Sequence, residues 1–210
     1  MSDVERFDRW AATYERSYLQ RLVFGPVHRT MLEVAVRERP HAMAILDVGC
    51  GTGRLLRGLE AAFPRARLEG VDASAEMVAE ARAMLPAGSR IQIRHATAEK
   101  LPYSESTFDL VFSSMTFHHW AGQQAGIAEV ARVLRPAGLW LLADFVATGF
   151  MRLVSRALRL RKFPDRSRLE PILAHAGLRI VGQHRVPAVG SQVPVLVIGL
   201  ADQVVQKTLS

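Results

Sequence analysis

A single cysteine, Cys50, occurs among the 210 residues, so no disulfide can form within the chain. No run of 18 or more apolar residues is present, and we therefore expect no membrane-spanning helix. The N-terminal stretch MSDVERFDRW is charged and contains no apolar export core, so we expect no signal peptide. An unpaired cysteine without an export signal predicts a cytoplasmic protein.

Charge is unevenly distributed along the chain. The net charge is +7, and residues 149–169 hold seven basic residues against one acid, which accounts for +6 of it. The rest of the chain is nearly neutral, so the sequence does not predict a general nucleic-acid-binding surface. The apolar content of 49% and the charged content of 22% are typical of a globular protein, and the length predicts a single domain over residues 1–210.

Apolar runs alternate with helical patterns, which predicts an α/β fold: a doubly wound, Rossmann-like, mostly parallel sheet with helices on both faces. The last two strands are joined by a linker too short for a helical crossover, so they should pair antiparallel. Residues 1–40 are expected to form a helical cap. The seven expected strands are 44–48, 67–72, 90–95, 108–113, 139–145, 178–186 and 193–201.

The stretch AILDVGCGTGRLL, residues 44–56, places three glycines on alternate positions between the first strand and a helix. Glycine lets the chain turn sharply and lets a ligand lie against bare backbone. One glycine would be enough for a tight turn, so the three favour a ligand-binding loop. This loop lies at the carboxyl end of a strand in a parallel sheet, which is where such folds bind ligands.

The type of ligand follows from the glycine spacing and from Asp72. The spacing is G-x-G-x-G rather than the dinucleotide pattern G-x-G-x-x-G, and the loop has no lysine to hold a phosphate. Asp72 ends the second expected strand, 19 residues after Gly53. A carboxylate at this position can accept both hydroxyls of a ribose. These features predict a nucleoside ligand without a pyrophosphate.

Four segments occur in an order that resembles one enzyme family: LDVGCGTG, GVDASAEMV, LPYSESTFDLVFSS and EVARVLRPAGLWLLAD. They are similar to class I S-adenosylmethionine-dependent methyltransferases, in the branch of small-molecule and quinone methyltransferases. The resemblance runs from about residue 7 to 145. It implies S-adenosyl-L-methionine as cofactor, a small-molecule methyl acceptor, and a seven-stranded sheet with an antiparallel last strand.

The resemblance also implies cofactor-binding residues. Asp47 would anchor the glycine loop and, through water, the ammonium group, and Asp72 would hold the ribose. Thr97 stands where the family often has a carboxylate for the adenine amino group, so we expect a weaker contact there. The full set of implied cofactor residues is Tyr14, Asp47, Gly49, Cys50, Gly51, Asp72, Ala73, Met77, Thr97, Ala98 and Ser113.

Three of these residues have a simpler alternative. Tyr14 could reach the methionine carboxylate, or could lie on a core-facing aromatic stripe. Met77 could pack on the adenine, or belong to the apolar face of its helix. Cys50 is a small filler or a nucleophile, and the filler is favoured because a reactive thiolate needs a basic neighbour.

The segment SSMTFHHW follows the fourth expected strand and places His118 and His119 beside the cofactor. Imidazole titrates near neutral pH, so either residue is a candidate general base for a hydroxyl acceptor. Both could instead only shape the pocket. Adjacent histidines without a nearby carboxylate do not predict a metal site.

Residues 146–176 are expected to form a variable region that covers the substrate. Its part 149–162 reads as a basic amphipathic helix, which favours a lid but also fits peripheral contact with an anionic membrane. The expected function is methyl transfer to a small apolar or aromatic acceptor. The alternatives are a membrane-associated lipid or quinone as acceptor, and a non-catalytic regulatory protein that binds the cofactor. The oligomeric state is not predicted.

Overall fold

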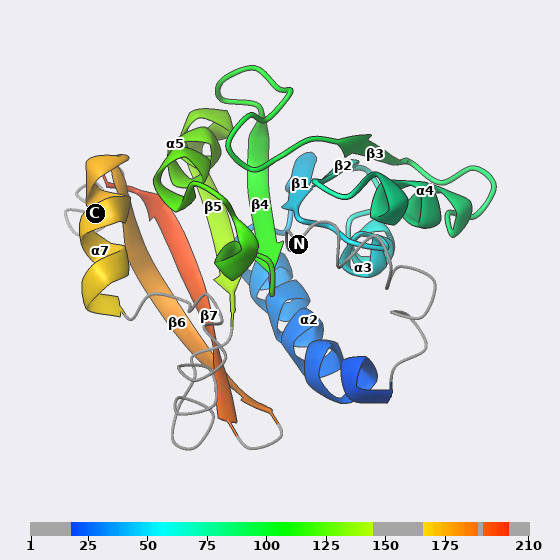
Figure 1. Cartoon of the computed structure of the whole chain (residues 1–210), viewed down its shortest axis with the longest axis horizontal. Coiled ribbons are helices and arrows are strands. Elements are labelled where there is room, and N and C mark those ends of the chain that lie inside the picture. The colour runs from blue at the N-terminus through cyan, green and yellow to red at the C-terminus, as the bar shows by residue number, and fades with distance from the viewer. Residues whose placement is uncertain (1–17, 145–165, 189–190, 202–210) are drawn as a thin grey trace.

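The computed structural model describes residues 18–144, 166–188 and 191–201, and Figure 1 shows how they are arranged. Seven strands form one sheet in the order β3-β2-β1-β4-β5-β7-β6. The first five strands run parallel, whereas β7 is antiparallel to both of its neighbours. The strands are β1 Ala44–Val48, β2 Arg67–Asp72, β3 Ile91–His95, β4 Phe108–Ser114, β5 Leu134–Ala143, β6 Leu178–Ala188 and β7 Ser191–Leu200.

Helices cover both faces of the sheet. Helices α2 (Tyr18–Glu38), α3 (Arg54–Ala62) and α4 (Ala75–Ala83) contribute to one core cluster. Helices α5 (Gln123–Val133) and α7 (Arg166–His175) contribute to the other cluster, and they lie beside β5 and β6 in Figure 1. This two-sided burial explains why nearly every residue of the central strands β1 and β4 is buried, instead of every second one. The predicted doubly wound α/β fold is confirmed.

Local sequence signals explain how α3 and α4 begin and pack. Leu55, Leu56 and Leu59 share the apolar face of α3, and all three are buried. Ser74 is the N-cap of α4, because its hydroxyl accepts the backbone N–H of Met77 at 3.1 Å. Both helices begin at the carboxyl end of a parallel strand, and this brings their N-termini to the same edge of the sheet.

The segment RPAG, residues 135–138, lies within an irregular start of β5. Helix α5 ends at Val133, and β5 begins at Leu134, which pairs with Phe108. The register between β4 and β5 then shifts between Phe108 and Leu110. Ala137 has φ 60°, in the left-handed region, which fits this irregularity.

Candidate cofactor and active site

The glycine loop lies between β1 and α3, at the point where the strand order reverses. The backbone N–H groups of Gly49 and Cys50 both donate to the carbonyl oxygen of Val71, at 2.8 and 3.0 Å. Gly49 has φ +78°, and a Cβ atom placed on it would lie 2.0 Å from Oγ1 of Thr116. The glycine is therefore required here both by the backbone conformation and by the close approach of the segment after β4.

Asp72 is fixed by two backbone hydrogen bonds at the end of β2. Its Oδ2 accepts the N–H of Gly51 at 2.7 Å, and its Oδ1 accepts the N–H of Ser74 at 3.0 Å. Burial raises the pKa of Asp72, and the hydrogen bonds from the backbone oppose this shift. The carboxylate is thus held in place and still borders open space, since it lines the pocket described next.

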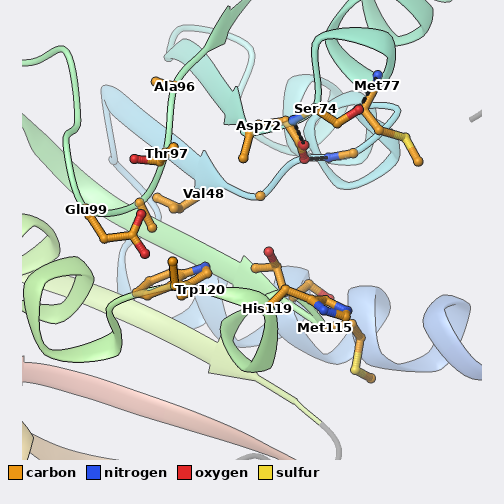
Figure 2. Close-up of a pocket in the computed structure, with 17 residues that line it drawn as sticks. Val48, Asp72, Ser74, Met77, Ala96, Thr97, Glu99, Met115, His119 and Trp120 are labelled. Carbon is orange, nitrogen blue, oxygen red and sulfur yellow. Dashed lines mark hydrogen bonds between the residues drawn. The ribbon is translucent and has the colours of Figure 1, made fainter. Parts of the chain in front are cut away.

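The larger of two adjoining pockets beside the glycine loop opens at the carboxyl ends of β1, β2 and β4 and measures about 910 Å³ including its mouth. Asp72 and Met77 lie on one side, and His119 and Trp120 lie on the other (Figure 2). Thr97 and Ala98 line its third side. A carboxylate beside a mostly apolar slot suits a nucleoside, with the sugar on the acid and the base on the apolar wall.

The smaller pocket continues from the larger one and measures about 480 Å³. Both pockets are lined by Gly49, Gly51, Ser114 and Met115, so they form one groove across the glycine loop. The residues that line only the smaller pocket include an acid, a cation and an imidazole: Asp47, Arg54 and His28.

Asp47 is buried, and its Oδ1 atom has no hydrogen-bond partner among the described residues. Burial, reinforced by the nearby Asp72, raises the pKa of Asp47 to about 8. An unpaired buried carboxyl group that lines a pocket is a suitable partner for a ligand cation.

His28, on α2, is the imidazole of the smaller pocket. Its Nε2 atom lies 3.1 Å from Oγ of Ser114, at the end of β4. Burial and the Arg54 cation lower the pKa of His28 to about 4, so its ring is neutral at pH 7. Among the described residues that line this pocket, Arg54 is therefore the one that carries a positive charge.

Comparison with known proteins identifies the family. The sequence matches the family described as "Methyltransferase domain" over residues 45–138. It is 33% identical over 187 residues to a malonyl-[acyl-carrier protein] O-methyltransferase of Geobacter sulfurreducens, covering 83% of this chain and 69% of that relative. The chain belongs to the class I S-adenosylmethionine-dependent methyltransferases. S-adenosylmethionine is therefore the cofactor that this methyltransferase has to accommodate.

Two further proteins resemble this methyltransferase. A ubiquinone/menaquinone biosynthesis C-methyltransferase of Syntrophotalea carbinolica is 37% identical over 142 residues, covering 66% of this chain and 59% of that relative. A solved S-adenosylmethionine-dependent methyltransferase of Aquifex aeolicus has a TM-score of 0.67 at 20% identity, over 94% of this chain and 99% of that one, which shows the shared fold. The chain spans about half the length of several curated relatives that it matches.

The groove of the methyltransferase fits S-adenosylmethionine. The unpaired Asp47 oxygen supplies an acceptor for an ammonium group, and Asp72 supplies one for ribose hydroxyls. A Cβ atom on Gly51 would meet no atom within 4 Å, so its backbone faces open space in which a ligand can lie.

Most residues that the sequence assigns to the cofactor are brought together by the structure. Gly49 and Gly51 line both pockets, and Asp47 and Cys50 line the smaller one. Asp72, Ala73, Met77, Thr97 and Ala98 line the larger one. Met77 is also buried on the apolar face of its helix, and its contact with the adenine stays a prediction. Tyr14 and the segment 149–162 lie outside the described residues.

Ser113 is placed differently from the prediction. Its hydroxyl is fully buried and accepts the indole N–H of Trp140 at 3.1 Å, and the residue lines neither pocket. Its neighbour Ser114 lines both pockets. Successive residues of a strand point to opposite faces, so the sequence prediction was off by one position.

Cys50 has the environment of a packing residue. Its side chain is buried, and a Cβ atom on Gly70 would approach its Sγ to 2.9 Å. Burial, together with the charges of Asp72 and Asp47, raises the pKa of the Cys50 thiol. A protonated, enclosed thiol is a poor nucleophile, which supports the filler interpretation.

The two adjacent histidines have different surroundings. His119 lines the larger pocket, whereas His118 lines neither pocket and contacts the buried carboxylate of Asp144. Both belong to the 3-10 turn η1 (Phe117–His119), and their ring centroids are 3.8 Å apart. Sequence reasoning missed Asp144, although it ends the quoted segment VLRPAGLWLLAD, because nothing in the sequence links it to a histidine 26 residues earlier.

Within the described ranges, no group of three or more His, Cys, Asp or Glu side chains could hold a metal ion. Over the same part of the chain, none of the helices combines the length and the apolar character needed to cross a membrane.

Proposed function

We propose that this chain transfers a methyl group from S-adenosylmethionine to a small apolar or aromatic acceptor. The observation that supports the proposal best is the continuity of the groove. Asp72 borders one end, Asp47 and Arg54 border the other, and bare glycine backbone runs between them. This order of groups matches the order of sugar, thioether arm and charged amino-acid head in the cofactor.

At the nucleoside end, Asp72 would accept the ribose hydroxyls with the oxygen lone pairs left after its two backbone hydrogen bonds. Met77, Ala96 and Ala98 would contact the adenine, because they form the apolar wall beside that carboxylate. Thr97 offers a neutral hydroxyl at the edge of this wall, so it contributes less than a carboxylate would.

At the amino-acid end, Asp47 would accept the ammonium group and Arg54 would pair with the carboxylate. The two residues line the same small pocket, and a bound ammonium group favours the ionised form of Asp47, so a zwitterionic head places each charge near its opposite. His28 is neutral and hydrogen-bonded to Ser114, so it shapes this pocket without adding charge.

When bound, the cofactor supplies a methyl group activated by a sulfonium. The protein's share of the reaction is to align the acceptor with that methyl group and to exclude water. His119, Trp120 and Met115 border the larger pocket beyond the glycine loop, and they would give the acceptor an apolar and aromatic wall.

A quinone or lipid taken from a membrane surface is a second candidate acceptor. The observation that favours it is the 37% identity to a ubiquinone/menaquinone C-methyltransferase. The malonyl-[acyl-carrier protein] relative instead points to an acceptor delivered by a carrier. A cytoplasmic location stays a prediction from the sequence.

Calorimetry with S-adenosylhomocysteine tests the cofactor half of the proposal. Asp72→Ala should weaken binding about a hundredfold, because a positioned charged acceptor contributes roughly 1.5–3 kcal/mol per hydrogen bond. Glu76→Ala, which removes an exposed carboxylate on α4, is the matched control and should bind like the wild type. Equal binding by all three proteins, or none by the wild type, would overturn the proposal.

Methyl transfer is then measured with radiolabelled S-adenosylmethionine and a panel of small phenols, quinols and carboxylates. Labelled product identifies an enzyme. Tight cofactor binding without any product favours the regulatory alternative.

A further inference from the structure

His118 and Asp144 form a closely defined pair at the ends of β4 and β5. Nδ1 of His118 lies 2.7 Å from Oδ1 and 2.9 Å from Oδ2 of Asp144. The backbone N–H of His118 donates to the same Oδ2 atom at 2.9 Å. Asp144 is fully buried, whereas 21% of the His118 side chain is exposed. Asp144 thus holds His118 through both its ring and its backbone, and the buried carboxylate cannot turn away to solvent.

This contact selects one form of the neutral imidazole. A carboxylate is an acceptor only, so Nδ1 must carry the proton that it donates to Asp144. The lone pair of the neutral ring is then on Nε2. A histidine oriented by a buried acid in this way is arranged to accept a proton at Nε2.

The pair lies next to the proposed active site, although His118 itself lines neither pocket. His118 belongs to the same short turn as His119, which lines the larger pocket, and the two rings lie 3.8 Å apart. The backbone N–H of Met115, another pocket residue, donates to the carbonyl oxygen of Ala143 at 2.8 Å, which fixes the segment after β4 against the residue before Asp144. Among the residues that the structure describes, the ionisable groups in contact with the His118 ring are Asp144 and His119.

We propose that His118 is the general base of the reaction, that Asp144 is its positioning residue, and that the acceptor is a phenolic hydroxyl compound. The inference rests on the proposed function, since it needs a bound methyl donor. A phenol is mostly protonated at neutral pH and must lose its proton on methylation, so a base accelerates the reaction. A carboxylate is already ionised at that pH and would gain nothing from the pair.

The step balances with these residues alone. The acceptor oxygen forms a bond to the methyl carbon, and the electron pair of the broken carbon–sulfur bond stays on sulfur. The hydroxyl proton goes to Nε2 of His118, and Asp144 stabilises the resulting imidazolium. Release of that proton to water restores the base.

Turnover of two probes tests the proposal, with S-adenosylmethionine as donor: catechol carries phenolic hydroxyls, and monomethyl malonate carries a carboxylate. Catechol should be methylated, and His118→Gln should lower kcat about a hundredfold or more. Asp144→Asn should have a similar effect, because an amide can donate to Nδ1 and thereby move the ring proton to Nε2. KM and the affinity for S-adenosylhomocysteine should be unchanged in both variants.

Two further variants separate positioning from packing. Asp144→Glu keeps an acceptor and should retain more kcat than Asp144→Asn, which is closer in size. His41→Gln removes an exposed histidine at the opposite edge of the sheet and should leave kcat unchanged.

The ring nitrogens can also be observed by 15N NMR of the whole chain, which needs no acceptor. Wild-type His118 should carry its proton on Nδ1, and Asp144→Asn should move it to Nε2. A proton on Nε2 of the wild-type ring, wild-type kcat in Asp144→Asn, or methylation of monomethyl malonate but not of catechol would each overturn the inference. Failure of S-adenosylhomocysteine to bind would overturn the proposed function instead.

Discussion

The two sides of the groove are built in different ways. The nucleoside side uses backbone groups and carboxylates that are close in sequence, since Gly51 and Asp72 are hydrogen-bonded across one strand-helix-strand unit. The opposite side joins segments that are farther apart, since His28 on α2 meets Ser114 at the end of β4 across 86 positions. Contacts made by the main chain restrict which residues can form the glycine loop. Contacts made by side chains can change when the acceptor changes.

The largest effect is expected for Gly49→Ala, which tests the side of the groove that is built from main chain. The new Cβ would lie 2.0 Å from Oγ1 of Thr116, at a backbone with φ +78°. We expect a loss of about 3 kcal/mol in the free energy of unfolding, from strain and overcrowding together, measured by urea denaturation. Gly88→Ala is the control: its φ is +81° but no atom lies within 4 Å, so it should cost only about 1 kcal/mol. Equal losses would show that the contact with Thr116 does not constrain the loop.

Asp47→Asn tests the buried acid of the groove through the pH dependence of stability. The pKa of Asp47 is raised to about 8 in the folded protein, so the folded state binds a proton that the unfolded state releases above about pH 4. This proton stabilises the fold at low pH, and the contribution is lost as the pH rises toward 8. Asparagine cannot ionise, so the fall in unfolding free energy between pH 4 and 8 should be shallower in the variant by a few kcal/mol. Parallel curves for the two proteins would contradict the raised pKa.

Arg54→Met separates the amino-acid end of the groove from the nucleoside end. The variant should bind S-adenosylhomocysteine about tenfold to a hundredfold more weakly, because a charge-assisted hydrogen bond is lost. Methylthioadenosine has no amino-acid head, so its affinity should be unchanged. Arg65→Met removes an exposed arginine outside the groove and serves as the control. A loss that is the same for both ligands would place Arg54 elsewhere in the cofactor site.

The smallest expected effect concerns Thr97. Thr97→Asp restores the carboxylate that the family often has at this position, and it should tighten S-adenosylhomocysteine binding by less than tenfold, a gain of about 1 kcal/mol. Thr97→Val, which has nearly the same shape and no hydroxyl, should weaken binding slightly. Calorimetry of the three proteins under one condition resolves the order, and a weaker Asp variant would place the adenine amino group away from residue 97.

The sequence predicted the nucleoside side well because periodicity and glycine spacing are local signals. Strands β1 and β2 were predicted with their observed bounds, and Asp72 lies at the predicted end of β2. Ser113 shows that such local signals do not fix the position of a side chain to within one residue. A shift of one residue along a strand moves the side chain to the opposite face.

The partners His28 and Asp144 could not be predicted from local patterns. Each depends on packing between segments that are far apart along the chain, so only the tertiary fold brings them to the site. Asp144 nevertheless has a recognisable place, the carboxyl end of a parallel strand, where polar residues are often functional.

The strand order also has a consequence for folding. Because β7 is inserted between β5 and β6, residues 178–188 have no place in the sheet until residues 191–200 have been synthesised. During translation, β5 is therefore an uncovered edge with a row of unpaired backbone groups, while β1 to β4 can already assemble. Substitutions that delay insertion of β7 should lower the yield of protein through aggregation before they alter any property of the mature nucleoside pocket.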